Sequence, residues 1–172
     1  ANSDGRHRLT HLYFVHPDDY SSFTELGVIA DFQLAPSSFT DEAFEDLEIL
    51  IGDPLDYYLP AFEMLNAGVD VVLSSDWDAD SLSPFEKIAF VQSGDLPNAP
   101  DLATTIRMMT LDVAYLLHHE EKTGSIEVGK LADMIVLDRN LFEVSANEVG
   151  ETAVLLTLLG GTDVYRADSF SR

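Results

Sequence analysis

Short apolar or β-type runs alternate with helical segments along the first two thirds of the chain, and this alternation constrains the fold most. The runs at 7–15, 28–34 and 69–76 are typical of buried strands. Helical segments are indicated at 17–26 and 83–94, each with a proline in its first turn. Strands separated by helices predict a parallel sheet with both faces covered, so we expect an α/β fold up to about residue 120.

The rest of the chain shows a different pattern. Further helices are expected at 57–68 and from about 101 to 119, the latter broken near Thr110, and the acidic segment 40–54 is expected to be loop plus helix. Beyond Lys122 the sequence becomes strand-like, with glycine-containing turns. We therefore expect a boundary there. The two parts are residues 1–121, the α/β part, and residues 122–172, part of a small β subdomain.

Charge and composition exclude several classes of protein. The chain has 31 Asp and Glu against 9 Lys and Arg, a formal net charge of −22, so nucleic acid and anionic membrane are not expected partners. No apolar run approaches the roughly 18 residues that a membrane span needs, and no signal-peptide core is seen, so we expect a cytoplasmic protein. Cysteine is absent, so a metal would have to be held by histidine and carboxylate.

Two residues near strand ends suggest metal chemistry. His11 lies within the first run and Asp76 ends the third. Because the carboxyl ends of parallel strands share one rim, both side chains can point into one cleft. Imidazole and carboxylate suit a catalytic zinc ion, and a carboxylate near such an ion can act as general base. Taken alone, the two residues also fit a core histidine and an N-cap.

The other histidines and the single tryptophan carry less information. His118 and His119 are adjacent, so on a helix they face about 100° apart, and a helix C-terminus favours cationic groups in any case. His16 precedes a proline and is expected to introduce a helix, while His7 lies in the opening segment. Trp77 lies at the rim, where its ring either stacks on a substrate or simply covers the carboxyl ends of the strands. The sequence has no nucleophile elbow, P-loop or GxGxxG motif.

Several segments resemble one enzyme family. GSIEVGKLADMIVLD, at 124–138, resembles the segment that enters the β-sandwich subdomain of the amidohydrolase superfamily. SSDWD followed by SPFEKI is similar to the strand-8 motif of its YtcJ-like branch, amidohydrolase family 3, which includes N-substituted formamide deformylases. HRLTHL resembles the strand-5 element of that branch and ELGVIADFQ its strand 6. The likeness covers almost the whole chain, in the right order.

The resemblance implies a fold, a reaction and a site. The fold is the C-terminal half of a (β/α)8 TIM barrel, strands 5 to 8, in residues 1–121, with part of a composite β-sandwich in 122–172. The reaction is hydrolysis of an amide-type C–N bond in a small molecule through a metal-activated water. Asp76 would contact the divalent metal, zinc by preference, and take the proton of that water. His11 would be a metal ligand, and Trp77 is a candidate for substrate binding.

The chain departs from the family pattern in two ways. The segment DFQLAPSS has no histidine at the end of strand 6. The strand-1 His-x-His pair and the strand-4 Lys or Glu would precede residue 1, so we expect this piece alone to be inactive. A half barrel leaves two sheet edges and an apolar face uncovered, so we expect a homo-oligomer or association with a missing N-terminal half. The alternative hypothesis is a non-catalytic acidic α/β association module, or a degenerate relic of the fold.

Overall fold

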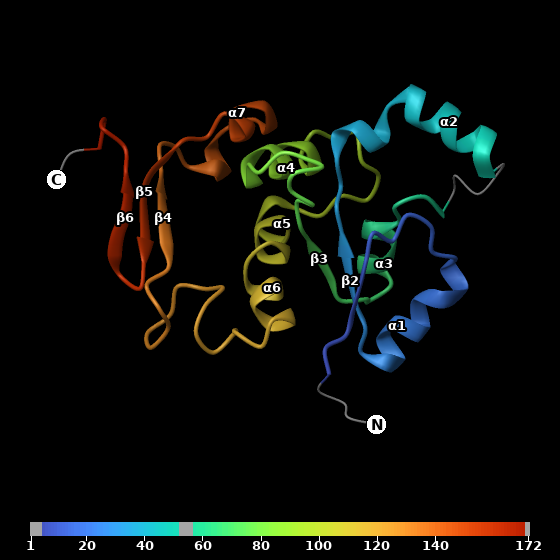
Figure 1. Cartoon of the computed structure of the whole chain (residues 1–172), viewed down its shortest axis with the longest axis horizontal. Helices are drawn as coiled ribbons and strands as arrows, with labels where there is room; N and C mark the ends of the chain where they lie inside the picture. Colours follow the sequence, from blue (N-terminus) through green and yellow to red (C-terminus); the bar gives the residue numbers. More distant parts are fainter. Residues whose placement is uncertain (1–4, 52–56, 171–172) are drawn as a thin grey trace.

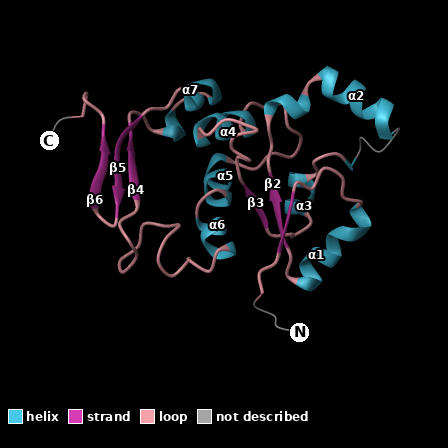
Figure 2. Ribbon diagram, in the orientation of Figure 1, coloured by secondary structure: helices cyan, strands magenta, loops and turns pink. Residues whose placement is uncertain are grey.

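A computed structural model describes residues 5–51 and 57–170 of the chain. These residues form two sheets with helices between them (Figure 1 and Figure 2). One sheet has three parallel strands in the order β1-β2-β3. The other has three antiparallel strands in the order β4-β5-β6. The mixed α/β architecture expected from the sequence is therefore confirmed.

Each of the apolar runs contains one parallel strand. Thr10 pairs with Asp31, and Asp31 pairs with Val72, so the carboxyl ends of all three strands lie at one edge of the sheet. The strands are shorter than the runs that predicted them. Their bounds are Arg8–Thr10 for β1, Ile29–Phe32 for β2 and Val71–Leu73 for β3.

Barrel strands 5 to 8 would give four parallel strands, whereas the described residues contain three. In the segment before the third strand, Tyr58 makes only an isolated antiparallel bridge with Phe14. Pro60 lies two residues after Tyr58 and has no amide hydrogen, so pairing cannot continue there. The helix expected from residue 57 accordingly begins later, at Ala61, with Pro60 as its N-cap.

Most helices begin and end where the sequence signals indicate. Gly27 ends the first helix with a φ of 63°, a left-handed conformation that glycine adopts without steric cost. Asp101 caps the split helix at 101–119 by accepting a hydrogen bond from the Thr104 N–H at 2.8 Å. The helix expected within 40–54 is present at Asp41–Ile51, and residues 52–54 of that segment lie outside the described ones. The helical elements in this part are η1 (Pro17–Asp19), α1 (Tyr20–Leu26), η2 (Pro36–Phe39), α2 (Asp41–Ile51), α3 (Ala61–Asn66), α4 (Pro84–Val91), α5 (Leu102–Met108) and α6 (Leu111–Leu116).

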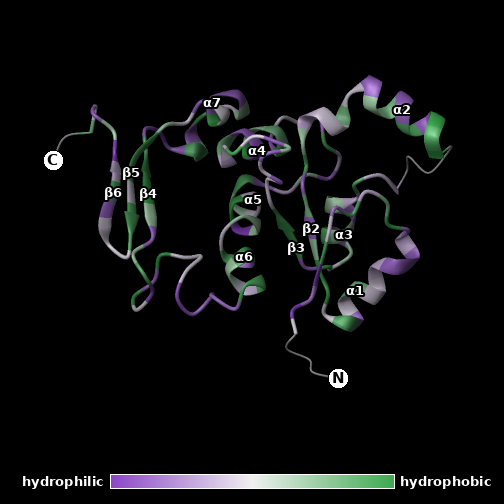
Figure 3. Cartoon of the chain, viewed as in Figure 1, coloured by the Kyte–Doolittle hydropathy of each residue, from purple (hydrophilic) through white to green (hydrophobic). Residues whose placement is uncertain are grey.

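The parallel sheet has two different faces. On one face, Phe32 and Leu73 are 0% and 2% exposed and belong to the large apolar core that α1 and α3 cover. On the other face, Ile29 and Val72 pack against Leu116 of α6. The same face also carries Asp31, which pairs with Val72, so it is only partly apolar. Strand β3 is hydrophobic along its length (Figure 3).

The antiparallel sheet lies within residues 122–172, where the sequence predicted a β subdomain. Gly160 and Gly161 both have positive φ, 55° and 80°, as a two-residue hairpin between β5 and β6 requires. An apolar cluster between α4 and α7 joins this part to the helices that precede it, with Phe85 and Val149 buried in it. None of the helices in the described ranges is long and apolar enough to cross a membrane. The elements are β4 (Met134–Leu137), η4 (Leu141–Glu143), α7 (Ala146–Gly150), β5 (Val154–Leu159) and β6 (Thr162–Arg166).

An ion pair fixes the segment before β1 to the end of α6. Nη2 of Arg6 lies 2.6 Å from Oε1 of Glu120, and the guanidinium of Arg6 lies over the Tyr115 ring, 3.8 Å from its centroid. The hydrogen bond from Arg6, supported by a backbone N–H and by the charge of Arg6, lowers the pKa of Glu120 from 4.5 to about 2.

The pH dependence of stability tests this ion pair. Because the folded-state pKa of Glu120 is lowered, the pair stabilises the fold above the unfolded-state pKa, and the effect is lost as pH falls from 4.5 toward about 2. We expect Glu120→Gln to lower the free energy of unfolding at pH 7 and to differ little from wild type near pH 2, measured by urea denaturation. Glu25→Gln, on the exposed surface of α1, is the control. An equal effect of Glu120→Gln at both pH values would contradict the assignment.

Candidate active site

The two residues predicted from the sequence lie next to each other. His11 directly follows β1, and Asp76 comes shortly after β3. Nε2 of His11 is 3.7 Å from Oδ1 of Asp76, and the two side chains are 41% and 42% exposed. The rim of the parallel sheet thus presents an imidazole and a carboxylate that are both open to solvent.

The backbone at both residues is unusual. Strand β2 lies between β1 and β3, so roughly 10 Å, two strand spacings, separates the strands that carry the pair. His11 and Asp76 both adopt the left-handed region, with φ of 59° and 54°. At His11 this conformation ends the extended backbone of β1, and at Asp76 it turns the chain three residues after the end of β3. Positive φ is uncommon outside glycine, and such strained residues cluster at functional sites.

A buried polar network lies beneath the pair, at the carboxyl end of β2. Gln33, 9% exposed, accepts a hydrogen bond from the His11 backbone N–H at 3.2 Å. The Gln33 side-chain amide donates to Oδ1 of Asp31 at 3.0 Å and to Oγ of Ser74 at 2.5 Å. The Ser74 hydroxyl in turn donates to Oδ1 of Asp31 at 2.8 Å. Gln33 therefore links the backbone of one predicted site residue to the strand that leads to the other.

Asp31 is the centre of this network and is only 1% exposed. Nη1 of Arg8 donates to its Oδ2 at 3.1 Å, and Oγ1 of Thr10 lies 3.3 Å from the same oxygen. A carboxylate buried in a sheet is tolerated only when it is paired and hydrogen-bonded in this way. The network joins all three parallel strands at their carboxyl ends.

Asp31 and Gln33 were not among the predicted site residues, because residues 28–34 form a near-continuous apolar run. A signal was present, since Asp31 and Gln33 are two positions apart in that run. Side chains two apart in a strand share a face, so two polar residues at this spacing indicate a polar patch inside an otherwise apolar strand.

The other predicted residues lie apart from the pair or have local roles. Trp77 is 66% exposed at the rim, and its role in substrate binding stays a prediction. His16 accepts a hydrogen bond from the Asp18 N–H at 3.2 Å and so introduces the helical turn, as expected. His118 lies just after α6 with a φ of 57°, and the carbonyl of His7 accepts a bond from β2. In the part of the chain that the structure describes, no group of three or more His, Asp or Glu side chains can hold one metal ion.

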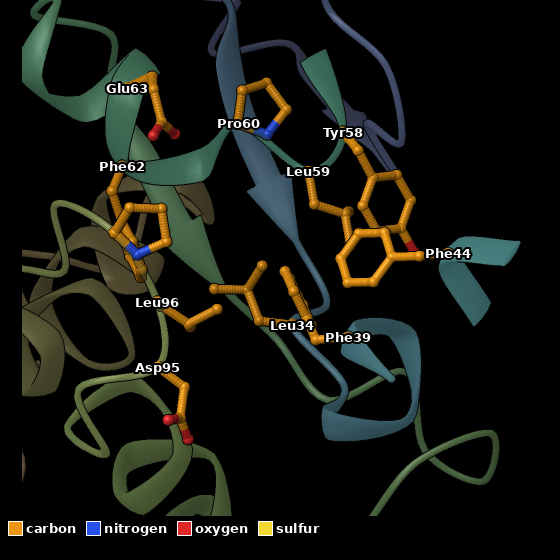
Figure 4. Close-up of a pocket in the computed structure, with 11 residues that line it drawn as sticks. Leu34, Phe39, Phe44, Tyr58, Leu59, Pro60, Phe62, Glu63, Asp95 and Leu96 are labelled. Atoms are coloured by element: carbon orange, nitrogen blue, oxygen red, sulfur yellow. The ribbon is translucent and has the colours of Figure 1, made fainter. Parts of the chain in front are cut away.

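An apolar hollow of about 330 Å³ lies near the rim (Figure 4). Tyr58 lines it, and the Tyr58 ring lies 6.2 Å from the Tyr13 ring, which stacks at 6.2 Å on the ring of His11. A row of rings thus leads from the candidate pair to the hollow. The side chains that line it are mainly aromatic or aliphatic and include Leu34, Phe39, Phe44, Tyr58, Leu59 and Leu96.

Replacing Gln33 tests the polar network while leaving the side chains of His11 and Asp76 unchanged. We expect Gln33→Met, close in size, to lower the free energy of unfolding by about 1–3 kcal/mol, because buried partners lose their hydrogen bonds. The measurement is urea denaturation at neutral pH. Asn147→Leu, on the exposed surface of α7, is the matched control and should change stability by less than about 0.5 kcal/mol. Equal effects of the two substitutions would show that the network contributes nothing.

Comparison with known proteins shows which family the chain belongs to. The profile of the amidohydrolase family matches residues 1–165. The chain is 36% identical over 114 residues to the N-substituted formamide deformylase of Arthrobacter pascens, covering 62% of this chain and 21% of that protein. It is 29% identical over 176 aligned positions to the imidazolonepropionase of Bacteroides thetaiotaomicron, covering 87% of this chain and 39% of that protein.

A solved structure agrees on the fold. The crystal structure of an adenosine deaminase from Xanthomonas campestris with bound zinc matches with a TM-score of 0.67 and 22% identity, covering 92% of this chain and 37% of that one. The chain therefore spans well under half the length of these three proteins, between 21% and 39%. The family expected from the sequence motifs is confirmed by a match that includes both site residues and both sheets: the chain belongs to the amidohydrolase family.

Proposed function

We propose that this chain contributes His11 and Asp76 to the active site of a metal-dependent amidohydrolase that cleaves an amide-type C–N bond in a small molecule. The observation that carries the proposal is the 3.7 Å approach of Nε2 of His11 to Oδ1 of Asp76 at the carboxyl rim of the parallel sheet. This rim is where (β/α)8 barrel enzymes place their chemistry. Family membership supports the same conclusion.

The donor atoms of the pair fit a zinc ion. Zinc binds imidazole nitrogen and carboxylate oxygen at about 2.0–2.2 Å, so two such donors in tetrahedral geometry lie ~3.4 Å apart. The observed 3.7 Å is close to this separation. The exposure of both side chains, 41% and 42%, leaves them accessible to an ion from solvent. His11 and Asp76 are thus the residues of this chain that would hold the divalent metal.

The chemistry of the reaction assigns a second role to Asp76. When bound, the metal supplies a Lewis acid that makes water a better nucleophile near neutral pH. The Asp76 carboxylate accepts the proton of the attacking water and can pass it to the nitrogen that leaves when the C–N bond breaks. His11 would bind the metal through a ring nitrogen, and Gln33 holds the His11 backbone in place. The printed name of the Arthrobacter pascens relative, a deformylase of N-substituted formamides, supports an amide-type substrate.

A complete site needs groups from outside the described residues. The pair supplies two donors, and zinc sites use three protein ligands in catalysis. We infer that association supplies the rest, either with an N-terminal half that carries the remaining barrel strands or with a second copy of this chain. The apolar side chains on and just after the edge strand β1 favour such a partner, since Leu9, Tyr13 and Phe14 are 51%, 47% and 38% exposed.

A second function has one observation in its favour. The strand-6 segment DFQLAPSS lacks a histidine, so a ligand that many superfamily members provide is missing from this chain. A non-catalytic association module, or a degenerate relic of the fold, would tolerate this loss. Metal binding separates the two functions.

Zinc binding tests the active-site proposal directly. We expect the chain to bind Zn²⁺ in equilibrium dialysis, and His11→Ala and Asp76→Ala each to weaken binding by at least about tenfold, because each removes one donor. Asp78→Ala, an exposed carboxylate two positions from Asp76, is the matched control and should bind as wild type does. Absence of binding by the self-associated, higher-mass species, or an equal loss in the control, would favour the non-catalytic function.

Sedimentation tests the need for a partner. One chain has a mass of 19.0 kDa, and we expect a larger species in velocity runs, since a half barrel buries its edge and open face by self-association when no N-terminal half is present. A Leu9→Lys substitution on the edge strand should shift the distribution toward the monomer, and Leu26→Lys, exposed on α1, should not. A compact monomer for the wild-type chain would contradict the proposed association.

A further inference from the structure

The loop at residues 74–83 carries both Asp76 and Trp77 and connects β3 to α4. Lys87 of α4 lies beneath this loop and is only 3% exposed. Its ammonium donates a hydrogen bond to Oδ2 of Asp80, within the loop, at 2.8 Å. The same ammonium donates to the backbone carbonyl of Leu34, just past the end of β2, at 3.0 Å. One buried cation therefore contacts the loop and the adjacent strand end.

The burial of this lysine requires both bonds. An ammonium group taken out of water is costly unless it is paired and hydrogen-bonded, and the two acceptors satisfy that requirement here. Burial of Asp80 by itself raises the pKa of that carboxyl, but the hydrogen bond from Lys87, a backbone hydrogen bond at Ser81 and the charge of Lys87 together lower it. The lowered pKa keeps the Asp80 carboxyl ionised at neutral pH, with its Oδ2 2.8 Å from Nζ of Lys87.

The anchor point of this lysine is next to the anchor point of His11. Leu34 follows Gln33, whose side chain accepts the His11 N–H. The end of β2 therefore holds one member of the candidate pair through Gln33 and the loop of the other member through Lys87. Within the loop, the Ala79 N–H donates to the Asp76 carbonyl at 2.7 Å, so a tight turn connects Asp76 to Asp80.

We propose that Lys87 is a positioning residue, which through Asp80 fixes the 74–83 loop to the end of β2 and keeps the Asp76 carboxylate beside His11. Its importance for catalysis rests on the proposed function, whereas the fixing of the loop needs neither metal nor substrate. Lys87 contacts neither member of the pair through these two bonds, and it acts by restricting where the loop can lie.

Trp77 makes the proposal testable, because it is the single tryptophan of the chain and lies in this loop. Time-resolved fluorescence anisotropy of Trp77 reports motion of the loop on the nanosecond scale. We expect the fast-decaying fraction of the anisotropy to rise by about twofold or more in Asp80→Ala and Lys87→Met, since loops without such contacts move on that scale. Asp80→Asn should show a smaller rise, because its amide oxygen still accepts from the ammonium.

Two controls and a fold measurement keep the result unambiguous. Lys122→Met and Asp168→Ala change exposed residues of the same types far along the chain and should leave the anisotropy as in wild type. Far-UV circular dichroism establishes which variants are folded. If Lys87→Met does not fold, the two Asp80 variants decide. An unchanged anisotropy in folded Asp80→Ala would overturn the proposal, and so would equal effects of Asp80→Ala and Asp168→Ala.

Zinc binding by the same variants separates this proposal from the proposed function. If the wild-type chain binds Zn²⁺, Asp80→Ala should weaken binding by about tenfold through misplacement of Asp76, as loss of residues that orient ligands does elsewhere. A mobile Trp77 in Asp80→Ala together with no zinc binding in wild type would support the loop anchor and refute the metal site. Zinc binding with an unchanged Trp77 would refute the loop anchor alone.

Discussion

The carboxylate of Asp31 is the constraint on which the rim of the parallel sheet depends. It is buried in the middle strand, and its oxygens accept hydrogen bonds from residues on all three strands, including Arg8 and Ser74. A shift of β2 by one residue would turn this carboxylate into the apolar core on the opposite face, away from every donor. Burying an unpaired carboxylate costs several kcal/mol, so the network fixes the register of the sheet as well as the positions of the strand ends.

The candidate site uses this fixed edge as its base. Gln33 extends the network toward the rim and accepts a hydrogen bond from the His11 backbone N–H. The backbone position from which the imidazole projects is therefore fixed. Asp76 is placed less directly, because it lies in a loop beyond the end of β3. Catalytic groups on rigid elements are held more precisely than groups on loops, and a loop therefore needs contacts of its own to match them. The buried bonds of Lys87 to Asp80 and Leu34 are contacts of this kind.

The sequence predicted the strands that carry the candidate site. It did not predict the backbone conformations and the polar network that bring the site residues together. Largely apolar runs locate β2 and β3, because burial on both faces of a sheet favours apolar side chains. The meeting of His11 with Asp76 depends on positive φ at both residues, and the residue types alone do not predict it, although His and Asp adopt positive φ more often than most. A fourth parallel strand was expected from the family resemblance alone, and Pro60 shows why the described segment around it cannot pair as one. Asp31 was present in the sequence as a polar interruption and was overlooked.

The exposure of the pair bears on how the site could work. At 41% and 42% exposure, the side chains of His11 and Asp76 lie in surroundings close to bulk water, where any two unit charges 4 Å apart interact by only about 1 kcal/mol. Electrostatic catalysis relies on excluding water, because the same charges then act in a medium of low dielectric constant. A partner that covers the open face would therefore do more than add metal ligands. By removing solvent from the pair, it would strengthen the interaction of every charge at the rim. The network around Asp31, directly below, is already buried in this chain.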